Sequence, residues 1–338
     1  MSNVAWNEPR VRNKVLLIVE GQHEKEKLLT RMLASFPEIN IEIDNIWIYE
    51  TNIYMLISKI IQEYGDDWFE QDIDLPYLIS KVKQLPVRET KNNYTNIFLI
   101  FDYERHDPNF SESKILMMQE YFSSAEDVGK LYINYPMVES YMDFWIPSDE
   151  KLKNKTVSSQ MKKGNEYKSS VKNTFVSALI QYPIKIYDIL TEKLGVDFSI
   201  AKRFVDQLMN KNDISTLIDF TEHELTGIIT EASLKTFSHQ LFHIAKALKY
   251  MENSNTYNSY MRDVFKTIVH HNIRKANKIQ NGVYDCNNQC LKQLFEGINE
   301  CDILKKQNEY SDLNGMAIIS VLNTSVFILP EYNTDLVF

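Results

Sequence analysis

The chain has 338 residues, of which 44% are apolar and 25% are charged, with only 9 Gly and 9 Pro. This composition excludes collagen-like, low-complexity and largely disordered proteins, and the length allows two domains of ordinary size. No apolar run reaches the ~20 residues that a membrane-spanning helix needs. The N-terminus also lacks the apolar core of a signal peptide, so we expect a cytoplasmic protein.

Charge is distributed unevenly along the chain, whose formal net charge is −9. Residues 1–150 hold 14 Lys or Arg against 26 Asp or Glu, whereas residues 151–172 hold seven Lys and one Glu. Residues 173–338 are near balance, with 16 basic and 19 acidic side chains. An acidic region followed by a short basic segment fits a metal-binding domain beside an anion-binding strip. The alternative is a solvated acidic surface joined to a lysine-rich linker.

The first 145 residues alternate between predicted strands and predicted helices. Apolar runs typical of strands buried on both faces lie at 14–20 and 96–102, and further strand candidates lie at 43–49 and 130–135. Segments with apolar residues on one helical face lie around 28–33 and at 53–64, 75–85 and 113–122, and another helix is expected from 137 to 145. This alternation predicts an α/β fold with a mostly parallel four-stranded sheet flanked by helices. Ligands of such sheets bind beyond the carboxyl ends of the strands.

The character of the sequence changes after the lysine-rich segment. Helical periodicity is found at 171–181, 184–194, 199–210, 223–231, 233–252 and 257–279. The apolar stretch 316–329 fits a helix, a hairpin or one long buried element, because periodicity alone does not separate them. We therefore predict a metal-binding catalytic domain over residues 1–150. A mainly α-helical domain over residues 151–338 would bind substrate or a partner.

Two acidic motifs follow predicted strands. Glu20 ends the first apolar run, Gly21 permits a tight turn, and Glu24 lies one helical turn further on. Asp102 ends the third run, and Glu104 points to the same face as Asp102 because alternate side chains of an extended segment do so. The two motifs are therefore expected to converge at one edge of the sheet.

Four carboxylates in a small volume repel one another unless a cation neutralises them. Carboxylate oxygens favour hard cations, so we expect Mg²⁺ or Mn²⁺, which can support phosphodiester cleavage. The candidate ligands are Glu20, Glu24, Asp102 and Glu104, with Asp107 and Glu139 as further candidate acids. Acids at helix starts and in polar loops are also common without a metal, and that alternative stays open for each of them.

The motifs resemble those of the Toprim domain, which occurs in topoisomerases, primases and OLD-family nucleases. IVEGQHEKEKLL, with Glu20 and Glu24, is similar to the first Toprim motif. FDYERHD is similar to the second but departs from its Asp-x-Asp form, because Glu104 stands in the second position. PMVESY, with Glu139, resembles a later segment of OLD-like and anti-phage Toprim proteins. The resemblance covers about residues 14–145 and implies that Glu20, Asp102 and Glu104 are catalytic.

The second half of the chain, with HHNIRKANKIQ and NTSVFIL, resembles the Toprim effector subunits of bacterial PARIS defence systems, which work with an ABC-type ATPase. That resemblance implies a toxic, metal-dependent endonuclease of anti-phage defence, with tRNA or other RNA slightly favoured over DNA. It also implies an ATPase partner subunit, and a homodimer is a further option. The alternative is a non-enzymatic partner subunit of such a complex. A primase-type transferase is a third hypothesis, without nucleotide-binding elements to support it.

The basic segment contains the candidate nucleic-acid contacts. Phosphate binding needs positive charge here, because the acidic half of the chain would repel a nucleic acid. The expected contacts are Lys151, Lys153, Lys155, Lys162, Lys163 and Lys168. A mobile linker is the alternative interpretation of the same lysines.

Overall fold

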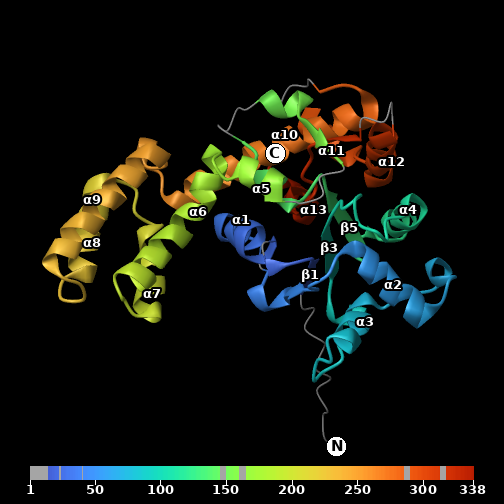
Figure 1. Cartoon of the computed structure of the whole chain (residues 1–338), viewed down its shortest axis with the longest axis horizontal. Coiled ribbons are helices and arrows are strands. Elements are labelled where there is room, and N and C mark those ends of the chain that lie inside the picture. Colours follow the sequence, from blue (N-terminus) through green and yellow to red (C-terminus); the bar gives the residue numbers. More distant parts are fainter. Residues whose placement is uncertain are drawn as a thin grey trace, which may run out of the picture.

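The structure is a computed structural model that describes residues 14–22, 24–39, 41–144, 150–159, 165–284, 290–312 and 317–338. In this part of the chain, a mostly parallel sheet is flanked by helices, and a helical region follows it (Figure 1). The predicted α/β class and the helical character of the second half are therefore confirmed.

Four parallel strands form the body of the sheet, in the spatial order β2-β1-β3-β5. They are β1 (Val15–Val19), β2 (Ile46–Ile48), β3 (Asn96–Asp102) and β5 (Gly129–Asn134). Every side chain of β1 is buried, which explains its continuous apolar run. A fifth strand, β4 (Ser123–Ser124), pairs antiparallel with β5 at the edge. Strand β4 was not predicted, because two exposed serines carry no apolar pattern.

The helices predicted between these strands are present. They are the π-helix η1 (Glu24–Leu29) with α1 (Thr30–Ser35), then α2 (Ile53–Tyr64), α3 (Leu75–Val82) and α4 (Glu112–Tyr121). Short 3-10 helices are η2 (Ile43–Asn45), η3 (Trp68–Glu70) and η4 (Lys91–Asn93). Asn52, Asp74 and Ser111 begin α2, α3 and α4 by accepting hydrogen bonds from backbone N–H groups of the first turn.

The helix predicted to begin within 137–145 is present only as a short 3-10 helix, η5 (Val138–Met142), and the chain leaves helical geometry at Asp143. Residue 145 lies outside the described residues. Both ends of η5 are held by tertiary contacts. The Val138 N–H donates to the Asp102 carboxylate at 2.7 Å, and Asp143 binds Lys155 and Tyr167. Side chains distant in sequence therefore decide the conformation of this segment.

The second half is mainly helical, as predicted. Its elements are η6 (Glu150–Asn154), α5 (Asn165–Val171), α6 (Phe175–Asp188) with the π-helix η7 (Ile189–Lys193), α7 (Phe198–Leu208), α8 (Ile214–Leu225), α9 (Glu231–Leu248), η8 (Glu252–Ser254), α10 (Tyr257–Asn281), α11 (Leu291–Glu296) and α12 (Glu300–Asp312). The break expected near residue 182 is absent, because α6 continues through Pro183. The helix predicted at 223–231 is wrong: Gly227 turns at a φ of +80°, and Thr230 caps a new helix.

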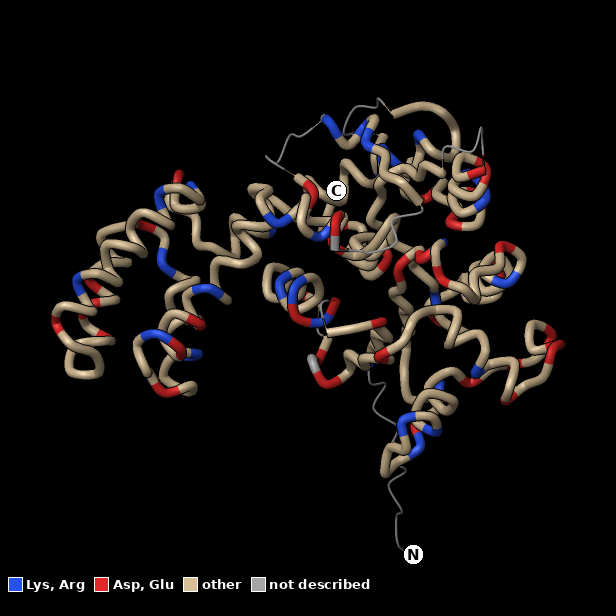
Figure 2. The backbone as a smooth tube through the Cα atoms, viewed as in Figure 1, with Lys and Arg blue, Asp and Glu red and all other residues tan. Residues whose placement is uncertain are grey.

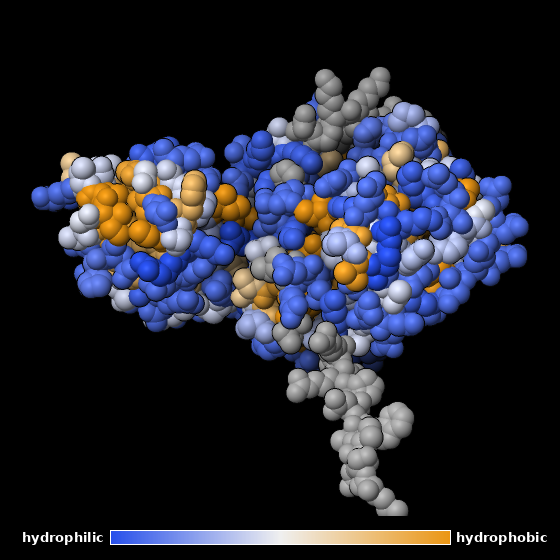
Figure 3. Space-filling view, turned by 90° about the horizontal axis from the view of Figure 1, so that it is seen from below, coloured by the Kyte–Doolittle hydropathy of each residue, from blue (hydrophilic) through white to orange (hydrophobic). Residues whose placement is uncertain are grey.

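Helices α7, α8 and α9 form an arm that extends away from the sheet (Figure 1). Basic and acidic residues are interspersed along its backbone (Figure 2). Apolar side chains gather on one of its faces (Figure 3), and Phe198 is 70% exposed. A groove of about 300 Å³ lies between η7 and α9, with Ile189, Leu194 and Phe237 in its lining. No helix in the described residues is long and apolar enough to cross a membrane.

The last described segment returns to the N-terminal sheet. Strand β7 (Ile318–Ser320) pairs antiparallel with β6 (Thr156–Ser158), and Leu322 bridges to Tyr135 just beyond β5. The chain then forms η11 (Ser325–Phe327), α13 (Ile328–Tyr332) and η12 (Thr334–Leu336). The stretch for which the sequence left three alternatives is thus a strand followed by short helices. The division at residue 150 stays a prediction, although segments from both sides of it pack together.

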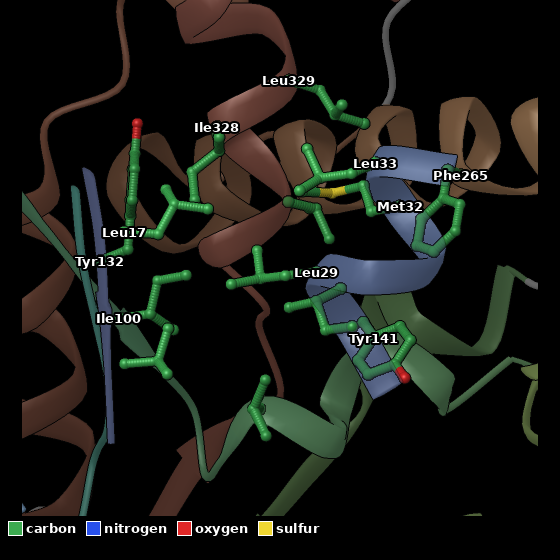
Figure 4. Close-up of a cluster of buried hydrophobic side chains, with 14 of the residues drawn as sticks. Leu17, Leu29, Met32, Leu33, Ile100, Tyr132, Tyr141, Phe265, Ile328 and Leu329 are labelled. Carbon is green, nitrogen blue, oxygen red and sulfur yellow. The ribbon is translucent and has the colours of Figure 1, made fainter. Parts of the chain in front are cut away.

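One face of the sheet is covered jointly by N-terminal and C-terminal helices (Figure 4). The sheet contributes Leu17, Ile100 and Tyr132, and α13 contributes Ile328 and Leu329, all with no exposed surface. Side chains of η1, α1, η5 and α10 complete the cluster: Leu29, Met32, Leu33, Tyr141 and Phe265. Burying one such side chain stabilises a fold by about 1.5–3 kcal/mol, so the core of the sheet depends on the end of the chain.

Candidate metal centre

The parallel pairing of β1 and β3 brings Glu20 and Asp102 together. Val19 pairs with Ile100, so both strands end at the same edge of the sheet. The Asp102 N–H donates to Glu20 Oε2 at 3.3 Å, and the Asp102 side chain is buried. Continuous apolar runs that each end in an acid therefore place two carboxylates side by side.

Glu24 reaches the same edge because the chain turns sharply after β1. The Gly21 N–H donates to Glu24 Oε2 at 2.9 Å, and Glu24 is buried at the start of η1. A Cβ at position 21 would lie 3.2 Å from this carboxylate oxygen. Glycine at this position therefore leaves room for the close approach of the Glu24 side chain.

Asn52 holds the two acids that follow β3. Its Nδ2 donates to Glu104 Oε2 at 3.1 Å and to Asp107 Oδ2 at 2.7 Å, while its Oδ1 accepts from the Met55 N–H. One amide thus begins α2 and fixes Glu104 and Asp107 beside it. An Asn before a helical pattern signals a helix cap in the sequence, but the contact with a loop about fifty residues away was not foreseen.

Glu139 joins the group from η5. Its side chain is only 4% exposed, and its Oε1 lies 3.2 Å from the ammonium of Lys168, which comes from α5. The hydrogen bond from the neighbouring Val138 N–H to Asp102 places η5 against the end of β3. The structure thus brings together Glu20, Glu24, Asp102, Glu104 and Glu139, called the carboxylate cluster below, with Asp107 beside Glu104.

The electrostatics of the carboxylate cluster are those of buried like charges. Burial, and then repulsion from Glu104 and Glu24, raise the pKa of Glu20 to about 8. Burial also raises the pKa of Asp102, and the negative charges of Glu20, Glu24 and Glu139 act in the same direction. Burial raises the pKa of Glu24 as well, and Glu139 adds to the shift. Bound protons or a nearby cation therefore lower the repulsion within the cluster, and the charge of Lys168 already acts in that direction.

The donor chemistry of the carboxylate cluster fits Mg²⁺ or Mn²⁺. All five side chains offer carboxylate oxygens, which these hard cations prefer, and a divalent charge would relieve the repulsion that raises the pKa values. Among the described residues, however, no three or more His, Cys, Asp and Glu side chains are arranged as a ready-made metal site. Side chains would therefore have to move for a metal ion to bind. The ion pair between Lys168 and Glu139 is one contact that would have to change.

The predicted nucleic-acid contacts do not share one environment. Lys168 faces the carboxylate cluster, and Lys155 pairs with Asp143. Lys151 is exposed on η6, and the ammonium of Lys153 lies 5.5 Å from the centre of the Tyr284 ring. Lys162 and Lys163 lie outside the described residues. Two of the predicted contacts, Lys155 and Lys168, therefore form ion pairs with acidic side chains of the protein itself.

Lys275 fixes the basic segment to α10, a role that the sequence did not reveal. Its side chain is buried, and its ammonium donates to the carbonyl oxygens of Leu152, Lys153 and Lys155 at 2.9, 3.2 and 3.0 Å. Lys278, one turn later, donates to the same Lys153 carbonyl at 2.9 Å. A lysine in a helical pattern normally indicates a solvated face, so only the tertiary structure shows this clamp.

Asn323 anchors η5 from the C-terminal segment. Its Nδ2 donates to the Val138 carbonyl at 2.8 Å and to Ser140 Oγ at 3.1 Å, and its N–H donates to Asn272 Oδ1 at 2.8 Å. All three hydrogen bonds are buried. Those to Val138 and Ser140 hold the residues directly before and after Glu139. The end of the chain therefore helps to position an acid of the carboxylate cluster.

Comparison of the chain with protein-family models, curated proteins and solved structures finds no match. Function therefore has to be inferred from the carboxylate cluster and from the elements that hold it.

Proposed function

We propose that this chain is a Toprim-type, divalent-metal-dependent endonuclease that hydrolyses phosphodiester bonds, with tRNA or other RNA as the favoured substrate. The observation that carries the proposal is the convergence of Glu20, Glu24, Asp102 and Glu104 where β1 and β3 end. Ligands of open α/β sheets bind at this edge, and an all-carboxylate donor set suits Mg²⁺ or Mn²⁺.

The residues of the carboxylate cluster would have different roles: metal binding and proton transfer. Glu20, Glu24, Asp102 and Glu104 would hold the metal, which would supply Lewis-acid polarisation of a phosphoryl oxygen and offset their charge. Glu20, with a pKa of about 8 before metal binding, can take up or release a proton near neutral pH. The Val138 N–H orients Asp102, and Asn52 orients Glu104.

Lysines of the basic segment would bind the phosphates of the substrate. The carboxylate cluster repels phosphates, so a bound nucleic acid needs lysines nearby. Lys151 and Lys153 lie on η6, which Lys275 holds against α10, so their backbone is fixed. The proposed role as a toxic effector of anti-phage defence, with an ABC-type ATPase as partner, rests on the resemblance of the sequence motifs.

Cleavage of a substrate panel tests this function. Wild type, Glu20→Gln and Glu26→Gln are incubated with tRNA, single-stranded DNA and duplex DNA in Mg²⁺ or Mn²⁺. Glu26 is an exposed acid of η1, the helix that follows Glu20, so its variant is a matched control. We expect Glu20→Gln to lose roughly 10²–10⁴-fold in cleavage rate, the usual contribution of an acid–base group, and Glu26→Gln to cut like wild type. Equal cutting by Glu20→Gln at matched purity contradicts the proposal.

A non-enzymatic partner subunit is the second candidate function. It is favoured by the Lys168–Glu139 ion pair, which places a cation of the protein itself at the acids. A bound metal raises stability in proportion to ln(1 + [L]/Kd), so thermal unfolding with and without Mn²⁺ separates the two candidates. Absence of both Mn²⁺ stabilisation and cleavage selects the partner subunit.

A further inference from the structure

We propose that Lys168 is an internal counter-cation of the carboxylate cluster, and that a divalent metal ion has to displace its ammonium in order to bind. The inference rests on the proposed function, because it concerns access to the same metal site.

The position of Lys168 is that of a cation among acids. Its ammonium lies 3.2 Å from Glu139 Oε1, whose side chain is only 4% exposed. The same positive charge acts on Glu20, Glu24 and Asp102, which contribute the remaining negative charge at the strand ends. Lys27, on η1, adds positive charge near Glu139. Lys168 therefore offsets part of the negative charge of the same carboxylates that would bind a metal ion.

Helix α5 does not depend on Lys168 for its attachment. The neighbouring Tyr167 is buried, and its hydroxyl donates to Asp143 Oδ2 at 2.9 Å. Thr174, just after α5, donates to the Met142 carbonyl at 2.6 Å. Lys168 itself remains 35% exposed and has a long, flexible stem. The ammonium can thus swing into solvent while α5 stays docked on η5.

Binding of a divalent ion to the carboxylate cluster is unfavourable while the Lys168 ammonium stays paired with Glu139. Like charges a few ångströms apart repel strongly near a protein surface, and an oxygen that accepts from an ammonium offers fewer lone pairs to a metal. Coupling between two binding events is reciprocal, so metal binding must loosen Lys168 as much as Lys168 weakens metal binding. Metal affinity is therefore set partly by a residue outside the Glu20 and Asp102 motifs.

Calorimetric titration with Mn²⁺ tests the competition. The variants are Lys168→Met, which removes the charge, Lys168→Arg, which keeps it, and Lys185→Met, which removes an exposed lysine of α6. We expect Lys168→Met to bind Mn²⁺ at least about tenfold more tightly than wild type, from the loss of one nearby positive charge. Lys168→Arg and Lys185→Met should stay within about threefold of wild type. Equal or weaker binding by Lys168→Met overturns the inference.

A second measurement uses wild type alone, in case Lys168→Met does not fold. Acetylation of lysines is followed by peptide mass spectrometry with and without saturating Mn²⁺. Lys168 should react faster when Mn²⁺ is bound, because its ion pair is broken, whereas the rate at Lys185 should not change. Unchanged or slower reaction of Lys168 in the presence of bound Mn²⁺ overturns the inference but leaves the nuclease proposal standing. Absence of Mn²⁺ binding in wild type and every variant overturns both.

Discussion

At the scale of single residues, Glu20 links the stability of the metal-free protein to pH. Its pKa is about 8 in the folded state, above its ordinary value of 4.5. Between these values the folded protein keeps a proton that the unfolded chain releases, so stability is full below the lower value and is lost as pH rises through the upper one. We expect the melting temperature of wild type in chelator to fall across this window, and Glu20→Gln to weaken the fall. Glu26→Gln should keep the wild-type slope; an unchanged slope in Glu20→Gln would contradict this assignment.

At the scale of elements, Asn52 couples a helix start to the carboxylate cluster. Asn52→Ala removes the cap of α2 and frees Glu104 and Asp107, so we expect a loss of about 1–2 kcal/mol in unfolding free energy. We also expect slower cleavage, because Glu104 loses its position. Urea denaturation and cleavage assays measure the two effects. Thr230→Ala, which removes the cap of α9 in the arm, should lower stability similarly without slowing cleavage; equal cleavage by both variants would exclude a positioning role for Asn52.

Also at the scale of elements, Lys275 and Lys278 attach η6 to α10. Lys275→Met leaves the Leu152 and Lys155 carbonyl oxygens without their ammonium donor, while the Lys153 carbonyl keeps its bond from Lys278, and we expect a loss of about 2–3 kcal/mol in unfolding free energy. Lys278→Met removes a partly exposed neighbour and should cost about 1 kcal/mol or less. Chemical denaturation of both variants measures the difference, and similar losses would show that burial of Lys275 adds nothing.

At the scale of the whole molecule, the sheet is not expected to fold without the end of the chain. A fragment of residues 1–150 lacks Phe265, Ile328 and Leu329, which cover the sheet in the intact protein (Figure 4). We expect this fragment to lack a cooperative thermal transition, because a sheet face without cover exposes its core to water. A sharp transition in the fragment would instead show an autonomous domain that ends near residue 150.

The same dependence can be measured in the full chain. Leu329→Ala should cost about 2–5 kcal/mol, as for other fully buried leucines. Phe198→Ala, at an exposed site of the arm, should change stability by less than about 0.5 kcal/mol. Denaturant unfolding of both variants gives these values. A small effect of Leu329→Ala would mean that the C-terminal segment is dispensable for the sheet.

The sequence by itself determined the sheet strands and their meeting point. Apolar runs identified β1 and β3, because strands buried on both faces need apolar side chains throughout. The strand candidates at 130–135 and 43–49 gave β5 and β2, although β2 covers only part of its predicted segment. Parallel strands end at one edge, so the acids that follow β1 and β3 had to meet there. Helix α2 was equally clear, since its apolar residues recur on one helical face and Asn52 caps its first turn.

Only the tertiary structure decided which distant residues complete the carboxylate cluster. The contacts of Lys168 with Glu139 and of Asn52 with Glu104 join segments about thirty and fifty residues apart, and no local pattern encodes such partners. The return of α13 to the sheet is likewise invisible in periodicity, because a short apolar stretch buries equally well as strand or helix. Long-range packing, rather than local preference, therefore placed the cation, the amide and the C-terminal cover around acids that the sequence had already brought together.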